Sequence, residues 1–308
     1  MKGSLIGSSP WYKLFIVFVL VIVSTFVSLL VGTLSIPLFF DISFSGLMDY
    51  VQSPDLYERV DIVLYLQGLT TIGTFVLPAL LAVYLISPFS SDYLGLSSFP
   101  KKAGIIVGLL VVLTLSGTVI SDSLYRLSLA IPFPESMLGL KEYLDSAQVA
   151  MEEQMGRFLD MNGPFDFITV LIIMAVLPAV CEETLFRGVI QPLFIRAFKS
   201  SWAGIVVSSI IFGILHQQFY SFLSIFALSV VLGYLKYWTK SLWVSMIMHF
   251  FNNASIVVAI YFFDVSMEDI NGSTDAFSLN YFLVGSLLFG LSLYAMNRLS
   301  KEKRRDLV

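Results

Sequence analysis

Charged residues are scarce in this chain of 308 residues: they make up 13% of it, whereas hydrophobic residues make up 57%. With a mean hydropathy of +0.84, the composition excludes a soluble protein whose surface is covered by charged side chains. Cysteine occurs once, at Cys181, which excludes an intramolecular disulfide framework. The formal net charge of -4 does not indicate nucleic-acid binding. A membrane protein is the class that remains.

Several catalytic signatures are also missing. Neither the zinc-protease pattern HExxH nor the serine-hydrolase pattern GxSxG occurs. Cys181 lies in an apolar run, and no neighbour favours its thiolate form, so it is a poor candidate nucleophile. No solenoid-type repeat or soluble appendage interrupts the apolar segments. Any chemistry must therefore come from polar groups inside the membrane.

Apolar runs near or above the roughly 18 residues that span a bilayer as a helix recur along the chain. They predict an all-α fold, a polytopic integral membrane bundle of about eight transmembrane helices. The first run is too long for a removable signal peptide and lacks its cleavage pattern, so we expect a permanent helix. The predicted spans are 14–37, 62–87, 104–121, 167–187, 202–217, 219–237, 242–263 and 277–297.

Lysine and arginine are distributed unevenly between the two ends of these spans. If the N-terminus is inside, 14 of the 18 bases fall on the inner side. Because bases are retained on the cytoplasmic side, both termini are predicted to be cytoplasmic. The four outer bases are Arg59, Arg126, Lys141 and Arg157.

The predicted organisation is a single membrane domain in two parts. Residues 1–150 hold the first three spans and part of an outer segment, and residues 151–308 hold the remaining five spans as a catalytic core. The outer segment, 122–166, contains LKEYLDSAQVAMEEQMGRFL, with apolar residues at helical spacing among many acids. It is predicted either as an amphipathic helix on the outer surface or as a polar cap over the bundle.

Few ionisable groups remain inside the spans, where each costs at least a few kcal/mol and usually marks a functional path. Lys199, in the turn between two spans, is 17 residues from Glu182 and 17 from His216, so antiparallel helices rising from that turn place these two at one level. His249 and Asn253, nine and 13 residues beyond Lys240, lie about 13 and 20 Å along their helix. The carboxylates and both histidines can therefore converge on one buried cavity.

Glu183 and Arg187 stand four residues apart and can neutralise each other on one helix face. Alternatively, Arg187 extends to the membrane interface and keeps its charge in water. Glu182 is rotated by about 100° from Glu183 and is left for another role. Pro178, one turn earlier, frees a backbone carbonyl and permits a kink.

A carboxylate beside a histidine can take a proton from water and return it to a leaving amine. A histidine beside an asparagine amide can donate hydrogen bonds to a developing oxyanion. Together they predict peptide hydrolysis without a covalent intermediate. Two alternatives remain: zinc held by Glu182, His216 and His249, or purely structural ion pairs and interhelical hydrogen bonds.

Three short motifs, EETLFR, FGILH and HFFNN, follow one another within 182–253. In a chain with many spans, this order resembles the CPBP family of intramembrane endopeptidases, which includes type II CAAX prenyl endopeptidases and bacterial Abi-type proteins linked to bacteriocin immunity. The resemblance implies a bundle of about eight helices with a cavity open toward the cytosol and the bilayer. By that resemblance Glu182 and His216 activate water, and His249 and Asn253 form the oxyanion site. Glu183, Arg187 and Phe212 would support them.

The predicted function is therefore an intramembrane endopeptidase that acts on membrane-associated proteins or peptides. Metal-free catalysis is favoured because an asparagine on the histidine face suits oxyanion donation, with zinc as the alternative cofactor. A non-catalytic membrane binding or immunity protein, and a proton-relaying transporter, are hypotheses of other classes. The expected partners are the lipid bilayer and a peptide substrate, and the expected location is a bacterial plasma membrane, with the endoplasmic reticulum as the alternative.

Overall fold

The computed structural model describes residues 2–53, 58–87, 90–97, 99, 102–265 and 279–305. Within these residues the secondary structure is helical and includes no strand, which confirms an all-α polytopic membrane bundle. Lys101 and most of the predicted outer loop 264–275 lie outside the described residues. The helices are α1 (Pro10–Phe39), α2 (Leu47–Gln52), α4 (Val60–Thr71), α5 (Leu77–Ile86), α6 (Ser90–Leu94), α7 (Ala103–Leu129), α8 (Leu138–Phe158), α9 (Pro164–Leu171), α10 (Leu177–Leu185), α11 (Gln191–Phe198), α12 (Ser201–Leu215), α13 (Phe222–Thr239), α14 (Leu242–Phe263) and α16 (Leu279–Arg305).

Seven helical segments of the described chain are long and apolar enough to cross a membrane. Two of them join several helices end to end: α4 with α5 over Val60–Ile86, and α9 to α11 over Pro164–Phe198. The predicted span 202–217 differs, because α12 has only 15 residues and is about 22 Å long. The predicted outer helix corresponds to α8, and residues 150 and 151 both lie within it.

Three π-helical turns occur within the two joined helices: η1 (Ile72–Val76), η3 (Ile172–Val176) and η4 (Phe186–Ile190). Each ends two residues before a proline, namely Pro78, Pro178 or Pro192. Proline cannot donate the next backbone hydrogen bond, and a π turn accommodates the change of register without ending the helix. The helix that carries the acidic pair therefore stays continuous, but its backbone bonding changes on both sides of that pair.

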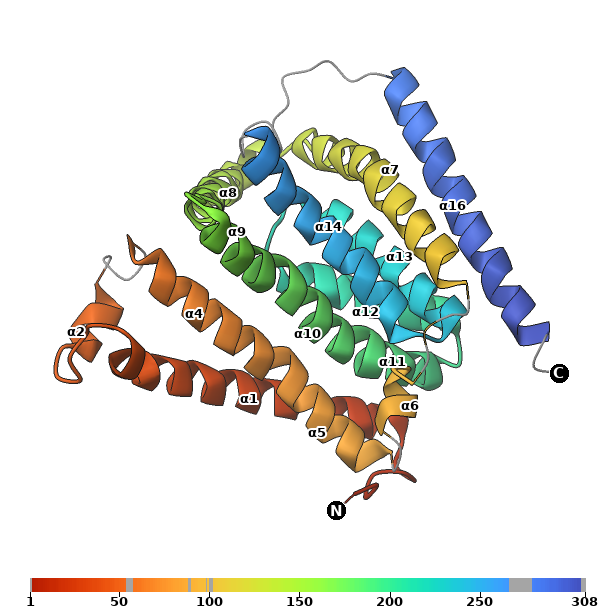
Figure 1. The fold of residues 1–308 in the computed structure, drawn as a ribbon, viewed down its shortest axis with the longest axis horizontal. Helices are drawn as coiled ribbons and strands as arrows, with labels where there is room; N and C mark the ends of the chain where they lie inside the picture. The colour runs from red at the N-terminus through yellow and green to blue at the C-terminus, as the bar shows by residue number, and fades with distance from the viewer. Residues whose placement is uncertain are drawn as a thin grey trace.

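The helix formed by α9, α10 and α11 runs through the middle of the bundle (Figure 1). On one side it faces α1, α4 and α5, and on the other it faces α12, α13 and α14. The termini, α6 and α11 lie toward one end of the bundle, and α2 and α8 toward the other. This places the acidic pair of α10 inside the protein.

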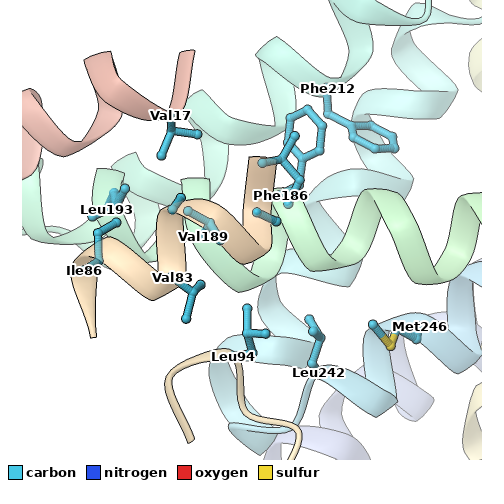
Figure 2. Close-up of a cluster of buried hydrophobic side chains, with 13 residues drawn as sticks. Val17, Val83, Ile86, Leu94, Phe186, Val189, Leu193, Phe212, Leu242 and Met246 are labelled. Carbon is cyan, nitrogen blue, oxygen red and sulfur yellow. The ribbon is translucent and has the colours of Figure 1, made fainter. Parts of the chain in front are cut away.

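A cluster of buried apolar side chains, shown in Figure 2, includes residues that follow the acidic pair along the chain. Phe186, Val189 and Leu193 follow the pair along the chain, and Phe212 of α12 and Leu94 of α6 pack with them. Within a bilayer the alternative surrounding for such side chains is lipid, so the stabilisation comes from their close van der Waals packing. The cluster thus holds α10 and α12 in fixed relative positions.

Gly204 lets α11 and α12 come into backbone contact. A Cβ atom at Gly204 would lie 2.5 Å from the backbone nitrogen of Ile195 and 2.7 Å from its Cα atom. We expect Gly204→Ala to destabilise the fold by about 1–3 kcal/mol, because a backbone cannot move aside as a flexible side chain can. Unfolding in a denaturing-detergent titration would measure the change.

Gly108→Ala in α7 is the matched control. A Cβ atom there meets nothing within 4 Å, so alanine should be neutral or stabilise the helix by about 0.5–1 kcal/mol. Equal stabilities for the two variants would contradict the close approach of α11 and α12.

Candidate active site

Glu183 and Arg187 form a buried ion pair where α10 passes into η4. Arg187 Nη1 donates to Glu183 Oε1 at 2.7 Å, and the two side chains are 2% and 0% exposed. A charge buried without a partner costs several kcal/mol, so each group depends on the other. The alternative in which Arg187 extends to the membrane interface is wrong.

Arg187 also binds α13 and rests against α12. Its Nη2 atom donates to the backbone oxygen of Ser229 at 3.1 Å and to its Oγ at 2.9 Å. The guanidinium carbon lies 4.6 Å from the centre of the Phe212 ring, close enough for a cation–π contact. Arg187 thereby links three helices around the acidic pair.

His249 of α14 is held directly by Glu183. Its Nδ1 atom lies 3.0 Å from Glu183 Oε1, the same oxygen that accepts from Arg187. Glu183 Oε2 is buried and has no hydrogen-bond partner among the described residues. One carboxylate oxygen therefore orients both the arginine and the histidine.

Glu182 faces both histidines. Its Oε2 atom lies 4.0 Å from His216 Nε2 and 4.0 Å from His249 Nε2. This oxygen is buried and has no hydrogen-bond partner within the described chain. A separation of 4.0 Å is too long for a direct hydrogen bond. Glu182 is thus free to act on a bound molecule.

The chemistry of their partners assigns the tautomers of both imidazoles. His216 Nδ1 lies 2.8 Å from the Phe212 carbonyl oxygen, which can only accept, so this nitrogen carries a proton. His249 Nδ1 likewise donates to the Glu183 carboxylate. In the neutral imidazoles both Nε2 atoms are therefore acceptors directed toward Glu182. His249 can donate through Nε2 only when it is doubly protonated, with two carboxylates beside it.

Phe212 forms an apolar wall of the site. Its ring centre lies 4.5 Å from that of His216 and 6.2 Å from that of His249. On its other side it meets Phe186 edge to face at 4.9 Å. A low-polarity wall strengthens the electrostatic interactions among the groups that it borders.

Asn253 is engaged with the backbone of η3. Its Nδ2 atom donates to the Met174 carbonyl oxygen at 3.2 Å. An α-helix would satisfy that carbonyl from residue 178, but Pro178 has no N–H. The side chain thus satisfies a carbonyl that the proline leaves free, and its second N–H remains available. Its Oδ1 atom accepts from Asn252 at 3.2 Å.

The donor types of Glu182, His216 and His249 suit zinc, but their spacing does not. Two ligands of a tetrahedral zinc ion lie about 3.3 Å apart, compared with the 4.0 Å found from Glu182 to each imidazole. Within the parts of the chain that the structure describes, no three His, Cys, Asp or Glu side chains are grouped closely enough to hold a metal ion. No catalytic step is therefore assigned to a metal.

Ser229 and the link from Glu183 to His249 are features that the sequence analysis missed. Serine is common in apolar helices, where it usually bonds to its own backbone, so nothing in its spacing indicates an arginine partner. The residue counts that placed Glu182 and His216 at one level gave no reason to assign His249 to Glu183. These contacts follow from the packing of α13 against η4 and of α14 against α10.

Residues 164–255 match the model of a protein family described as type II CAAX prenyl endopeptidase Rce1-like. The chain is also 34% identical over 96 residues to a protein of Bacillus subtilis (strain 168), "Uncharacterized protein YpbD". That alignment covers 30% of this chain and 46% of that protein, so the chain spans about half the length of the relative it matches. No solved structure matches this chain. Both comparisons thus find similarity over part of the chain, and the family match falls on the helices that carry Glu182, His216 and His249.

Proposed function

We propose that this protein is an intramembrane endopeptidase that hydrolyses peptide bonds of membrane-associated proteins or peptides. The observation that carries the proposal is the position of Glu182 Oε2, buried without a hydrogen-bond partner in the described chain and 4.0 Å from two imidazole Nε2 atoms. Glu183 also has one unpaired buried oxygen, but its other oxygen is held by Arg187 and His249, which gives that residue a structural role. Buried polar atoms usually have a partner, so the unpaired Oε2 atom leaves Glu182 available for another role. The family match at 164–255 supports the same class of reaction.

In the proposed reaction, water between Glu182 and His216 donates its protons toward these two acceptors. As its oxygen attacks the carbonyl carbon, Glu182 takes one proton, and a tetrahedral intermediate with a negative oxygen forms. The doubly protonated His249 and the free N–H of Asn253 donate to that oxygen. The carbon–nitrogen bond then breaks, and the proton held by Glu182 passes to the leaving amine.

The site suits a substrate that enters from the bilayer, at the level of the C-terminal end of α12, where His216 lies. If the excess of bases at the end of the bundle that carries the termini sets the orientation, as it does in membrane proteins generally, that end is cytoplasmic and His216 lies toward the opposite end. His216 is 29% exposed at its side chain, compared with 5% for His249, so the His216 side is the more accessible. The substrate class that fits is a peptide segment presented at or within the membrane.

The test compares membranes from cells that express the intact protein with membranes from cells that express Glu182→Gln at an equal level. Mass spectrometry of new peptide termini should find a set that is present only with the intact glutamate. Glu142→Gln, at an exposed glutamate of α8, is the matched control and should keep the full set. Identical sets for wild type and Glu182→Gln would overturn the proposal and favour a binding protein.

Treatment with a zinc chelator separates the metal-free mechanism from its alternative. We expect cleavage to persist, because Glu182 Oε2 lies 4.0 Å from each imidazole Nε2 atom, farther than two ligands of a tetrahedral zinc ion lie from each other. Cleavage that is lost with the chelator and restored by added zinc would assign Glu182, His216 and His249 to the metal instead.

A further inference from the structure

His216 lies at the end of its helix and is followed by a tight connection to α13, which we call the loop 217–221. The backbone of Gln217 adopts a left-handed conformation, with a φ of 56°, so the chain turns directly after His216. Apart from its Phe212 contacts, the imidazole depends on where this helix end is held. His249, by contrast, is bound by Glu183 from another helix. The position of His216 relative to Glu182 therefore depends on what fixes the loop.

Tyr220 in this loop is bound to the outer helix α8. Its side chain is buried, and its hydroxyl donates a short hydrogen bond to Asp145 Oδ1. Asp145 Oδ2 in turn accepts from Lys141 Nζ at 2.5 Å, so the carboxylate is held from two sides. We call this hydrogen bond the Tyr220–Asp145 latch.

Two further contacts join the chain before α8 to the loop 217–221 and to the start of α13. The rings of Phe133 and Phe219 lie 6.0 Å apart, and Ser224, just after the loop, donates to the Ser121 carbonyl oxygen at 2.7 Å. The partners of the loop and of Ser224 all come from residues 121–145. These contacts place that part of the chain beside the loop that follows His216.

We propose that Tyr220 and Asp145 are positioning residues: through their latch, α8 holds the loop 217–221 and thereby keeps the His216 imidazole at the distance from Glu182 that water activation requires. This role rests on the proposed function. Through Asp145, α8 would then help to position His216 for catalysis, although no residue of α8 contacts the reacting groups.

The latch holds over a wide pH range. Hydrogen bonds from Lys141 and Tyr220 lower the pKa of Asp145, so its contribution is present at neutral pH and is lost as the pH falls through that lowered pKa. The bond to Asp145 raises the pKa of Tyr220 to about 12, and Tyr125 of α7 acts in the same direction. The contribution of Tyr220 is therefore complete below about pH 10 and is lost as the pH approaches 12.

The test measures kcat and KM in liposomes for Tyr220→Phe and Asp145→Asn, with a substrate found by the terminus comparison. We expect kcat to fall by about 10- to 100-fold with KM unchanged, because a displaced catalytic group loses rate without losing substrate contacts. Tyr143→Phe, at a tyrosine of α8 that is 68% exposed, is the matched control and should keep the wild-type rate.

Two further measurements separate positioning from a general effect on the fold. In a His216→Gln background, Tyr220→Phe should cause no additional loss, since the latch acts through His216. Hydrogen exchange of the loop amides should rise in both latch variants, and it can be measured in inactive Glu182→Gln protein as well.

Faster loop exchange with an unchanged kcat would overturn the proposal, as would an additional loss of rate in the His216→Gln background. Unchanged exchange together with unchanged kcat would overturn it too. If wild type cleaves no better than Glu182→Gln, the proposed function itself fails. The exchange data would then show whether the latch holds the loop for another purpose.

Discussion

Glu182→Gln is expected to lower kcat by about 1,000-fold or more while the protein remains folded and inserted. Glutamine keeps the shape of the side chain but cannot take a proton from water, and loss of a general base costs about 10²- to 10⁴-fold in comparable enzymes. No hydrogen bond of Glu182 Oε2 is broken by the change, because that oxygen has no partner in the described structure. Initial rates with purified protein in liposomes measure the effect, and a denaturing-detergent titration checks that stability is unchanged.

Glu183→Gln is the matched comparison at the neighbouring residue. It removes the charge that pairs with Arg187 and His249, so we expect a loss of stability together with a loss of rate. A Glu182→Gln protein that retained more than about a tenth of the wild-type rate would exclude this carboxylate as the base.

Arg187→Met is expected to destabilise the bundle by about 3–5 kcal/mol, the largest change in stability that we predict for one substitution. Methionine fills part of the volume but leaves the Glu183 carboxylate buried with only His249 as its partner. Two hydrogen bonds to Ser229 are lost at the same time, although that backbone oxygen and hydroxyl are less costly to leave unpaired than a charge. Denaturing-detergent titration of the purified variant provides the measurement.

A double-mutant cycle tests the cause of this loss. Combining Arg187→Met with Glu183→Gln removes both charges, so the double variant should recover part of the stability that Arg187→Met loses. A strictly additive loss would show that the cost comes from packing against Phe212 and Ser229 and not from the unpaired carboxylate.

Much of the architecture follows from apolar runs and charge. The span 242–263 coincides with α14, and the outer helix was placed within two residues of α8 at its N-terminal end and one residue at its C-terminal end. The count from Lys199 places Glu182 and His216 at one level because two antiparallel helices share one rise per residue. Such arguments succeed for helix bounds and relative heights, which depend on the geometry of a single helix or a single turn.

Other features depend on contacts between distant parts of the chain. Pro178 indicates a break in the helix bonding, but the sequence does not show that a π turn keeps α9 and α10 continuous, or that Asn253 binds the free carbonyl. Tyr220 and Asp145 are separated by 75 residues, and each alone is an ordinary polar residue of a loop or an exposed helix. The described chain has seven long apolar helices, whereas about eight were predicted. The difference is local: α12 ends at Leu215, and the chain turns two residues later, at Gln217.

The short length of α12 has a consequence for the lipid around it. A bilayer has a hydrocarbon core about 30 Å thick, and a helix of about 22 Å can match it only if the membrane thins locally or if polar material fills the remaining depth. The polar latch and the loop 217–221 lie where this helix ends, so we expect the headgroup region to descend toward His216. The proposed reaction consumes one water molecule per turnover, and we expect this local hydrophobic mismatch to bring the aqueous phase close to His216.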